Sequence, residues 1–331
     1  MSAPSLRLRD CDPRQIRQRC RTGQLHIDYG AALVRVRSPL AVFARTLQRT
    51  YGAFRLPQAD HSAFADYHVE VVRPRGPRAF IRPQSQFRID GMQPFDPFPH
   101  SNALPLFEWG VNWCFGQRAN HYILLHAGVL AKGERAIIMA APPGSGKSTL
   151  AAAMMLRGFR LLSDEFGVLR PETGDLIAML KPVALKNQSV AVIRAFSDAA
   201  VIGPLFTGTR KGDVAHLAPN DASADAIHHP ARPALVIFPS FEAGAALDSQ
   251  RLPGKDAFAH LAFNSFNYHL LGAIGFEAVA DVIAACPAYQ VRYSDLDAVI
   301  GHIETLLDEA DAEAAAGAEM TVDAETTADV D

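Results

Sequence analysis

The stretch that decides the fold is APPGSGKSTL at residues 141–150, directly after the apolar run RAIIMA at 135–140. It matches the Walker A pattern [AG]xxxxGK[ST], a loop between a strand and a helix that surrounds the phosphates of a nucleotide. Gly144 and Gly146 allow backbone amides to turn inward, and the following helix adds its N-terminal amides and dipole. Ala141 stands where glycine is usual, which costs little in an ordinary backbone region. We therefore predict a working triphosphate-binding loop.

Each position of this loop has a predicted role. Lys147 is expected to reach the β- and γ-phosphates, and Ser148 is expected to ligate Mg²⁺. The other positions are expected to line the ATP site: Ala141, Pro142, Pro143, Gly144, Ser145, Gly146 and Thr149. ATP and Mg²⁺ are therefore the predicted cofactors.

The sequence on both sides of the loop predicts a βαβ unit. HYILLHAGVLA (121–131) and RAIIMAA (135–141) are strand-like apolar runs. GKSTLAAAMMLRGF (146–159) is rich in good helix formers and ends near Gly158, a typical helix stop. FRLLSDEFGVL (159–169) is expected to return as a strand. This order of strand, loop, helix and strand is the context that a phosphate-binding loop requires.

An acidic pair, Asp164-Glu165, follows the strand-like residues FRLLS. An acidic residue at the tip of a neighbouring strand is where P-loop proteins hold magnesium, and a second carboxylate can act as a base or position a water. We assign Asp164 to the metal and Glu165 to the base. The alternative is an ordinary charged surface turn.

The chain divides into three predicted segments: a β-rich N-terminal region at 1–115, a P-loop core with C-terminal helices at 116–307, and an acidic tail at 308–331. The N-terminal prediction rests on short runs with alternating apolar residues, such as DYHVEVVRP (66–74) and SQFRIDG (85–91). The predicted fold class is therefore α/β.

The composition of the 331 residues, 49% hydrophobic and 20% charged, is that of a globular protein. The net charge of −3 conceals an asymmetry, because nine of the 35 acidic residues lie from Asp308 onward, where there is no Lys or Arg. The rest of the chain is mildly basic, which is far from the signature of a nucleic-acid-binding protein. The tail has no aromatic residue and is typical of a disordered, solvated extension.

The cysteines and the hydropathy pattern bear on location. Cys11, Cys20, Cys114 and Cys286 form no CxxC pair, which favours a reducing compartment. No apolar run approaches the roughly 18 residues that a membrane span needs. We therefore predict a cytoplasmic protein that binds neither membrane nor nucleic acid.

The segment LLHAGVLAKGERAIIMAAPPGSGKSTLAAAMMLRGFRLLSDEFGVL (124–169) resembles the HPr kinase/phosphorylase family. That family has a strand with H-G-V-L, then the phosphate-binding loop, a helix ending in R-G, and a strand ending in two acidic residues. His126 precedes Lys147 by the family's spacing. Phrases such as LFEWGVNWC, PVALKNQSV, TRKGDVAHLAP and CPAYQVRYSDLD are similar to the subgroup called HPr kinase-related kinase A.

The resemblance implies roles for individual residues. Lys147 and its loop would hold ATP, and Asp164 or Glu165 would take the proton from a substrate serine hydroxyl, although the second acid of the family is usually Asp. His126 would lie against the phosphates as an assisting residue; the alternative for it is a packed histidine at a strand end. The resemblance also implies an acceptor serine on a protein or peptide, and a homo-oligomer, since the family forms rings.

Two other features of the downstream sequence bear on this resemblance. The family's Glu-Ile-Arg-Gly segment supplies a further metal carboxylate, whereas this chain has LKNQS (185–189) at that place. The magnesium shell therefore differs from the family's, which leaves reverse phosphorolysis an open question. Arg210 and Lys211, in TGTRKGDVAHL (207–217), are candidates to clamp the γ-phosphate or to recognise an acidic substrate. The alternative is a basic pair that faces solvent.

Together these features predict an ATP-dependent protein or peptide serine kinase, with Glu165, Asp164, His126, Lys147 and Arg210 as the catalytic residues. One alternative is a nucleotide-binding regulatory module that associates with a partner and transfers little or no phosphate. Another is a P-loop ATPase or small-molecule kinase, for which the sequence offers no substrate-specific motif.

Overall fold

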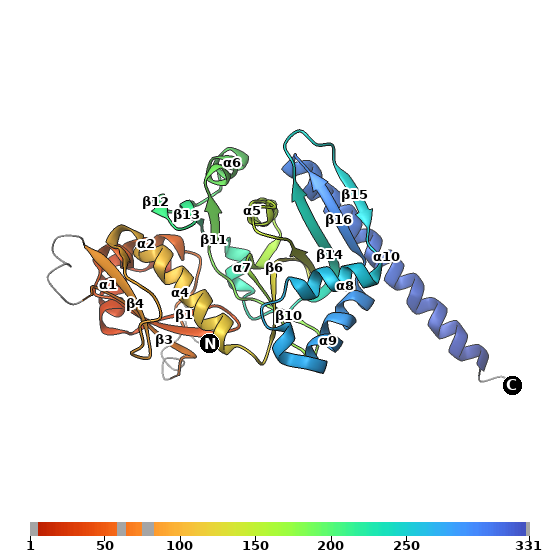
Figure 1. Ribbon diagram of the computed structural model, residues 1–331, viewed down its shortest axis with the longest axis horizontal. Helices are drawn as coiled ribbons and strands as arrows, with labels where there is room; N and C mark the ends of the chain where they lie inside the picture. The colour runs from red at the N-terminus through yellow and green to blue at the C-terminus, as the bar shows by residue number, and fades with distance from the viewer. Residues whose placement is uncertain (1–5, 58–63, 75–82, 329–331) are drawn as a thin grey trace.

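The computed structural model describes the secondary structure of residues 6–57, 64–74 and 83–328, and the side chains of these segments through residue 315. Figure 1 shows the N-terminal region on the left and the larger central sheet next to it, with α8 and α9 below the sheet and α10 extending to the right. The predicted α/β class is borne out as a mixed α/β protein with several sheets.

The N-terminal region contains a five-stranded sheet in the order β1-β2-β3-β4-β5. Its strands are β1 (Leu25–Asp28), β2 (Leu33–Arg37), β3 (Tyr67–Val72), β4 (Gln84–Ile89) and β5 (Phe98–Pro99). The β2–β3 pair is parallel and the other neighbours are antiparallel. Its helices are η1 (Leu8–Asp10), α1 (Pro13–Thr22), α2 (Ala41–Thr50), η3 (His100–Asn102) and α4 (Ala103–Arg118).

The central sheet has the order β10-β9-β6-β7-β14-β16-β15, and β8 also pairs with β6. Its strands are β6 (Ile123–Lys132), β7 (Arg135–Ala140), β8 (Arg160–Ser163), β9 (Phe166–Leu169), β10 (Leu176–Ile177), β14 (Arg232–Phe241), β15 (Asp248–Arg251) and β16 (Ala288–Tyr293). Strands β7, β14 and β16 are parallel, whereas β6 is antiparallel to β7, β8 and β9.

The predicted βαβ unit is present, with β6 inserted between its two strands. Helix α5 (Lys147–Leu156) follows β7 and leads to β8, and both strands run antiparallel to β6. The run FRLLSDEFGVL differs from its prediction, because it forms two strands, β8 and β9, with Asp164 and Glu165 at the break. Both strands pair with β6 and the register continues across the break, with Ser163 opposite Val129 and Phe166 opposite His126, and the turn between them is held by the Ser163 hydroxyl.

A small third sheet, in the order β11-β13-β12, adjoins α5. It consists of β11 (Val183–Lys186), β12 (Phe206–Thr209) and β13 (Gly212–Leu217), and the helices α6 (Gln188–Phe196) and α7 (Asp221–Asp225) lie nearby in the sequence. The predicted helical C-terminus is confirmed as α8 (Gly254–Phe263), α9 (Tyr268–Ala285) and α10 (Leu296–Ala328).

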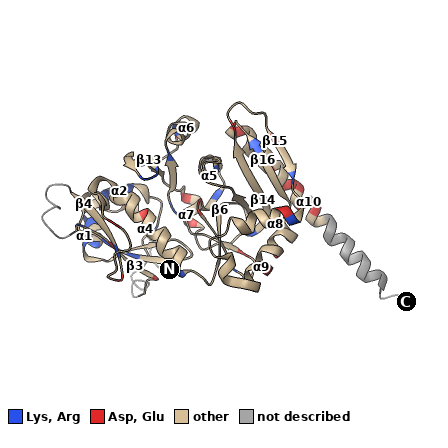
Figure 2. Ribbon diagram, in the orientation of Figure 1, with Lys and Arg blue, Asp and Glu red and all other residues tan. Residues whose placement is uncertain are grey.

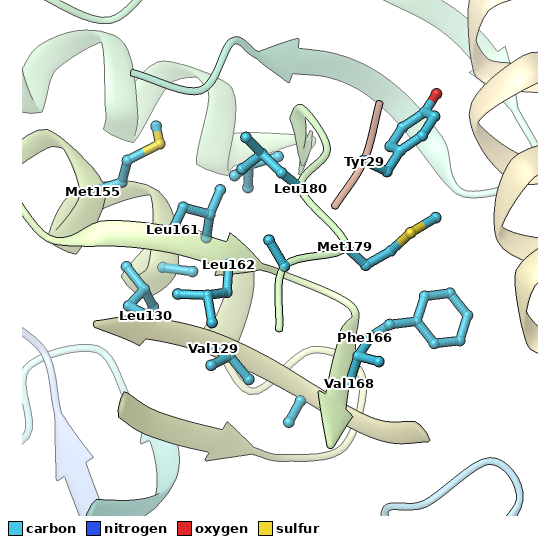
Figure 3. Packing of buried hydrophobic residues seen from close by; sticks show 14 of the residues in the cluster. Tyr29, Val129, Leu130, Met155, Leu161, Leu162, Phe166, Val168, Met179 and Leu180 are labelled. Atoms are coloured by element: carbon cyan, nitrogen blue, oxygen red, sulfur yellow. The ribbon is translucent and has the colours of Figure 1, made fainter. Parts of the chain in front are cut away.

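One hydrophobic core runs through the N-terminal region and the central sheet. Figure 3 shows Val129 and Leu130 of β6, Leu161 and Leu162 of β8, and Tyr29 of the N-terminal region packed in the same cluster. Two backbone hydrogen bonds join the regions here, from Ala31 N–H to the Ala178 carbonyl (2.7 Å) and from Leu180 N–H to the Tyr29 carbonyl (2.9 Å). The predicted boundary after residue 115 falls inside α4, so this helix belongs to both segments.

The acidic tail differs from the expected irregular extension. Its residues continue α10 to Ala328, consistent with the high helix propensity of its many Ala and Glu residues. Figure 2 shows acidic and basic residues gathered where α10 passes the central sheet. The pairs are Arg135 with Asp308 (3.2 Å) and Asp311, and Arg251 with Glu313 (2.8 Å). The beginning of the tail is therefore paired with the sheet.

Helix α9 corrects the expectation that no segment has the dimensions of a membrane span. By length and composition alone its 18 residues could cross a membrane, with a mean hydropathy of 1.4 and only 22% of the segment buried. Its backbone is interrupted at Gly272 (φ 56°, ψ −126°), so the helix is kinked one turn after it begins. The sequence did not predict a segment of these dimensions, because His269, Glu277 and Asp281 interrupt the apolar run.

Candidate active site

The predicted phosphate-binding loop connects the end of β7 to the first turn of α5. Gly144 (φ 93°) and Gly146 (φ 88°) adopt the left-handed conformation that glycine tolerates without strain. Ala141 is buried and is not among the described non-glycine residues with positive φ. Alanine therefore fits the first position of the loop, as the sequence predicts.

The ends of β14 and β16 pack against the loop. Phe241 N–H donates a hydrogen bond to the Ser145 carbonyl (2.9 Å), and Tyr293 Oη lies 3.5 Å from the Gly146 carbonyl. A Cβ atom at Gly146 would lie 2.7 Å from Tyr293 Oη and 2.8 Å from Phe241 Cβ. Gly146 is therefore required both for its backbone conformation and for this close packing.

Lys147 is buried at the start of α5, with 7% of its surface exposed. Its Nζ donates to the backbone carbonyl of His126 (3.2 Å), which ties the helix to β6. Burial lowers the pKa of Lys147 to about 8, while Asp164 and Glu165 act to raise it. The positive charge of Lys147 thus lies within electrostatic reach of Asp164 and Glu165.

Asp164 and Glu165 occupy the break between β8 and β9. The hydroxyl of Ser163 accepts hydrogen bonds from the backbone N–H groups of Glu165 (3.2 Å) and Phe166 (2.9 Å), which fixes the turn. Burial, followed by the charge of Glu165, raises the pKa of Asp164 to about 6, against the opposing effects of Lys181 and Lys147.

The two carboxyl groups differ in ionisation. Burial acts to raise the pKa of Glu165, but the cations of Lys181 and Lys211, with smaller effects from His126 and Lys186, lower it on balance. Glu165 is therefore the carboxyl group that stays ionised as the pH falls, whereas Asp164 gains a proton more readily. An ionised carboxylate is the form that can accept a proton from a hydroxyl group.

His126 lies in β6 beside the loop Asn264–Asn267 that joins α8 to α9. Its backbone N–H donates to the Asn264 carbonyl (2.5 Å), and its ring centroid lies 5.2 Å from that of Phe266. Burial, and then the charge of Lys147, lower its pKa to about 4. The imidazole is therefore neutral at pH 7, so it can offer a hydrogen bond to a phosphate but not a charge.

The two basic residues of the β12–β13 turn point to different surroundings. The guanidinium carbon of Arg210 lies 5.6 Å from the ring centroids of both Phe98 and Trp109, against the N-terminal region. Lys211, in contrast, acts electrostatically on His126 and Glu165. Of the predicted cation pair, Lys211 is thus the member directed toward the site.

The LKNQS segment meets this turn at the edge of the site. Asn187 adopts an unusual backbone conformation (φ 50°, ψ −120°), and its Oδ1 accepts from Asp213 N–H (3.1 Å). The preceding residue, Lys186, acts electrostatically on Lys147, His126 and Glu165. A cation therefore reaches the site from a segment where the resemblance would have supplied a carboxylate.

Three contributors to the site were not singled out from the sequence: Glu108 and Asn112 of α4, and Lys181 before β11. Asn112 Nδ2 donates to Glu165 Oε2, and Lys181 Nζ lies 3.0 Å from Glu108 Oε2. The sequence signal that could have identified them is a polar residue within an apolar stretch. Glu108 and Asn112 lie in LFEWGVNWCF, and Lys181 lies in LIAMLKPVAL. Buried polar residues in such stretches need partners, which the sequence does not name.

Ser148 and Asp164 are the residues that fit a nucleotide-bound Mg²⁺. Within the part of the chain that the structure describes, no group of three or more His, Cys, Asp or Glu side chains could hold a metal by itself. Such a cage is not needed, because nucleotide sites hold Mg²⁺ with one or two carboxylates, water and phosphate oxygens. Asp164 suits this role because burial disfavours its ionised form, and a nearby cation would favour that form again.

Comparison with known proteins gives distant similarity to solved structures, and to nothing else that was compared. No protein-family model matches the chain, and no curated protein matches it. Among solved structures, the chain is similar to the Hpr(Ser) kinase/phosphatase from Coxiella burnetii, with 16% sequence identity and a TM-score of 0.27. The matched region covers 57% of this chain and 97% of that chain.

Proposed function

We propose that this chain is an ATP-dependent serine kinase of the HPr kinase type, which transfers the γ-phosphate to a hydroxyl group of a protein or peptide. The observation that carries the proposal is the meeting of a glycine-rich loop and its buried Lys147 with the acidic pair Asp164-Glu165. A cation that suits phosphates and an ionised carboxylate that suits a hydroxyl group thus belong to one electrostatic cluster.

In this proposal the loop amides and Lys147 bind the triphosphate, and Ser148 and Asp164 hold Mg²⁺. A metal held there would neutralise negative charge on the phosphates. Glu165 accepts the proton of the acceptor hydroxyl as that oxygen bonds to the γ-phosphorus and the bond from phosphorus to the β,γ-bridging oxygen breaks. Lys211 and Lys186 offset the negative charge on the transferred group.

A second candidate is an ATP-binding regulatory module with little transfer activity. The observation that favours it is the LKNQS segment, because Lys186 and Asn187 stand where the resemblance would supply a metal carboxylate. Such a module would bind ATP but would transfer little or no phosphate. The two candidate functions therefore differ in whether the γ-phosphate is transferred, and both require ATP binding.

The test uses the full-length chain with MgATP labelled at the γ-phosphate. Nucleotide affinity is measured by calorimetry, and transfer is measured to serine-containing peptides and to small proteins encoded beside the gene. The kinase proposal expects phosphoserine on at least one acceptor, and loss of label when that serine is replaced by alanine. Tight ATP binding with no labelled acceptor in this set contradicts the kinase proposal and supports the regulatory one.

A further inference from the structure

A continuous line of polar contacts leads from the acidic pair into the N-terminal region; it is partly buried at Glu165 and Asn112 and buried from Glu108 onward. It runs from Glu165 to Asn112, from there to Lys181 and Glu108, and finally to Tyr51, whose hydroxyl donates to Glu108 Oε1 (2.5 Å). The far end is Tyr29, whose hydroxyl lies 3.1 Å from that of Tyr51. Since Tyr51 donates to Glu108, Tyr29 is the donor in the last contact.

Asn112 uses both ends of its amide in this line. Its Nδ2 donates to Glu165 Oε2, and its Oδ1 accepts from Lys181 Nζ. An ionised carboxylate can only accept and an ammonium group can only donate, so this orientation of the amide is the one that satisfies both neighbours. Asn112 is therefore locked between two groups of opposite charge.

Lys181 has no donor left for a ligand. Its three N–H groups are matched by three acceptors: the Glu108 carbonyl (3.1 Å), Glu108 Oε2 (3.0 Å) and Asn112 Oδ1. Its side chain is 7% exposed and that of Glu108 is 8% exposed. Lys181 thus connects Glu108 to Asn112 and does not bind substrate.

Helix geometry explains how α4 supplies both anchors. Glu108 and Asn112 are four residues apart, so they project from the same face of the helix. Figure 1 shows α4 on the side of the N-terminal sheet that faces the central sheet. A buried ion pair adds little stability compared with well-packed apolar residues, so stability alone does not explain the buried pair of Lys181 and Glu108.

We propose that α4 is part of the catalytic site, with Asn112 as a positioning residue that fixes the Glu165 carboxylate and with Glu108 and Lys181 as its anchors. This inference rests on the proposed function, since it concerns the orientation of the proposed base. It also gives the N-terminal region a role in the reaction. Orientation matters because small displacements of a catalytic group cost large factors in rate.

The test compares Asn112→Leu, which has a similar volume and removes both hydrogen bonds, with the wild-type full-length chain. The expected result is a fall in kcat of about 10- to 100-fold with KM for MgATP unchanged, because Asn112 makes no described contact with the phosphate-binding loop. Ser38→Ala is the matched control. It removes two buried hydrogen bonds of the N-terminal region, to the Val71 carbonyl (2.6 Å) and from Leu40 N–H (3.2 Å), and is expected to leave kcat unchanged.

A double-mutant cycle separates positioning from a general structural effect. If Asn112 acts through Glu165, adding Asn112→Leu to Glu165→Ala causes no further fall in kcat, whereas a general structural defect multiplies the two losses. Thermal unfolding and MgATP affinity verify that each variant is folded. Should Asn112→Leu not fold, Asn112→Gln takes its place, since it keeps the amide but shifts it by one methylene group, and the same cycle is measured.

The outcomes distinguish the positioning role of Asn112 from the proposed kinase function. Full activity in Asn112→Leu together with strong loss in Glu165→Ala overturns the positioning role and leaves the proposed base intact. Multiplicative losses in the double variant also overturn the positioning role. Full activity in Glu165→Ala overturns the proposed base, and absence of transfer by the wild type overturns the proposed kinase; in both cases the inference falls with it.

Discussion

At the scale of single residues, the site is formed by groups whose surroundings change their ordinary behaviour. Lys147 is a buried cation, His126 is a neutral imidazole, and Asp164 is a carboxyl group that burial pushes toward its protonated form. These environments arise because β6, α5 and the β8–β9 break meet within the core. Two substitutions test whether the environments are as described.

Gly146→Ala is expected to abolish MgATP binding and to destabilise the fold by about 1–3 kcal/mol. The added Cβ would meet Tyr293 Oη at 2.7 Å, at a position with φ of 88°. Gly144→Ala is the matched control, because Gly144 has a similar φ of 93° but a Cβ added there would meet no atom within 4 Å. Calorimetry and urea unfolding provide the measurements. Equal loss of stability in the two variants contradicts the packing described for Gly146.

His126 is expected to remain neutral across the range in which an ordinary histidine titrates. Its pKa in the folded chain is lowered to about 4 from 6.5. A lowered pKa means that its contribution to stability is complete above pH 6.5 and is lost as the pH falls toward 4. Histidine side-chain NMR checks the titration, and His126→Gln is expected to unfold at a lower pH than the wild type. A His126 midpoint near 6.5 contradicts the buried environment.

At the scale of elements, the sequence predicted the central unit well and its connections less well. The strands, loop and helix around residues 121–156 follow from apolar runs, glycines and helix formers, which are local signals. The run FRLLSDEFGVL keeps one register with β6 across Ser163 and Phe166, as a single strand would, but a turn held by the Ser163 hydroxyl divides it into β8 and β9. The direction of Arg210 depends on Phe98 and Trp109, which lie about 100 residues away along the chain. Such non-local contacts leave no local pattern.

The β12–β13 turn gives a prediction at this scale. Lys211→Met is expected to lower kcat about tenfold, because it removes a cation that acts on Glu165 and His126. Arg210→Met is the matched control, with an expected effect of less than about threefold, since its guanidinium is engaged with aromatic rings. Initial rates at saturating MgATP provide the measurement. A larger loss in Arg210→Met than in Lys211→Met would make Arg210 the cation that serves the site.

At the scale of the whole molecule, the N-terminal region and the central sheet share packed residues and hydrogen bonds. Tyr29 lies in the common core, and the Ala31–Ala178 and Leu180–Tyr29 hydrogen bonds cross between the regions. Ion pairs on the surface add to this, such as Arg7 with Asp225 (2.7 Å), although exposed pairs contribute about 1 kcal/mol or less. The sequence predicted three segments but not the core that the first two share, because the pattern of neither of these segments identifies its partner.

The shared core predicts cooperative unfolding. Thermal denaturation followed by Trp109 and Trp113 fluorescence, which reports on α4, is expected to coincide with the loss of MgATP binding, which reports on the core. Tyr51→Phe, which removes the buried hydroxyl that donates to Glu108, is expected to lower both midpoints together by a few degrees. Two separated transitions contradict a common core.

The central claim is that Glu165 accepts the proton from an acceptor hydroxyl in phosphoryl transfer from ATP. The most direct measurement is single-turnover transfer of labelled γ-phosphate to the acceptor by Glu165→Gln, with MgATP affinity measured in parallel. The expected result is a fall in transfer rate of about 100-fold or more with nucleotide affinity retained within a few-fold. Transfer by Glu165→Gln at the wild-type rate contradicts it.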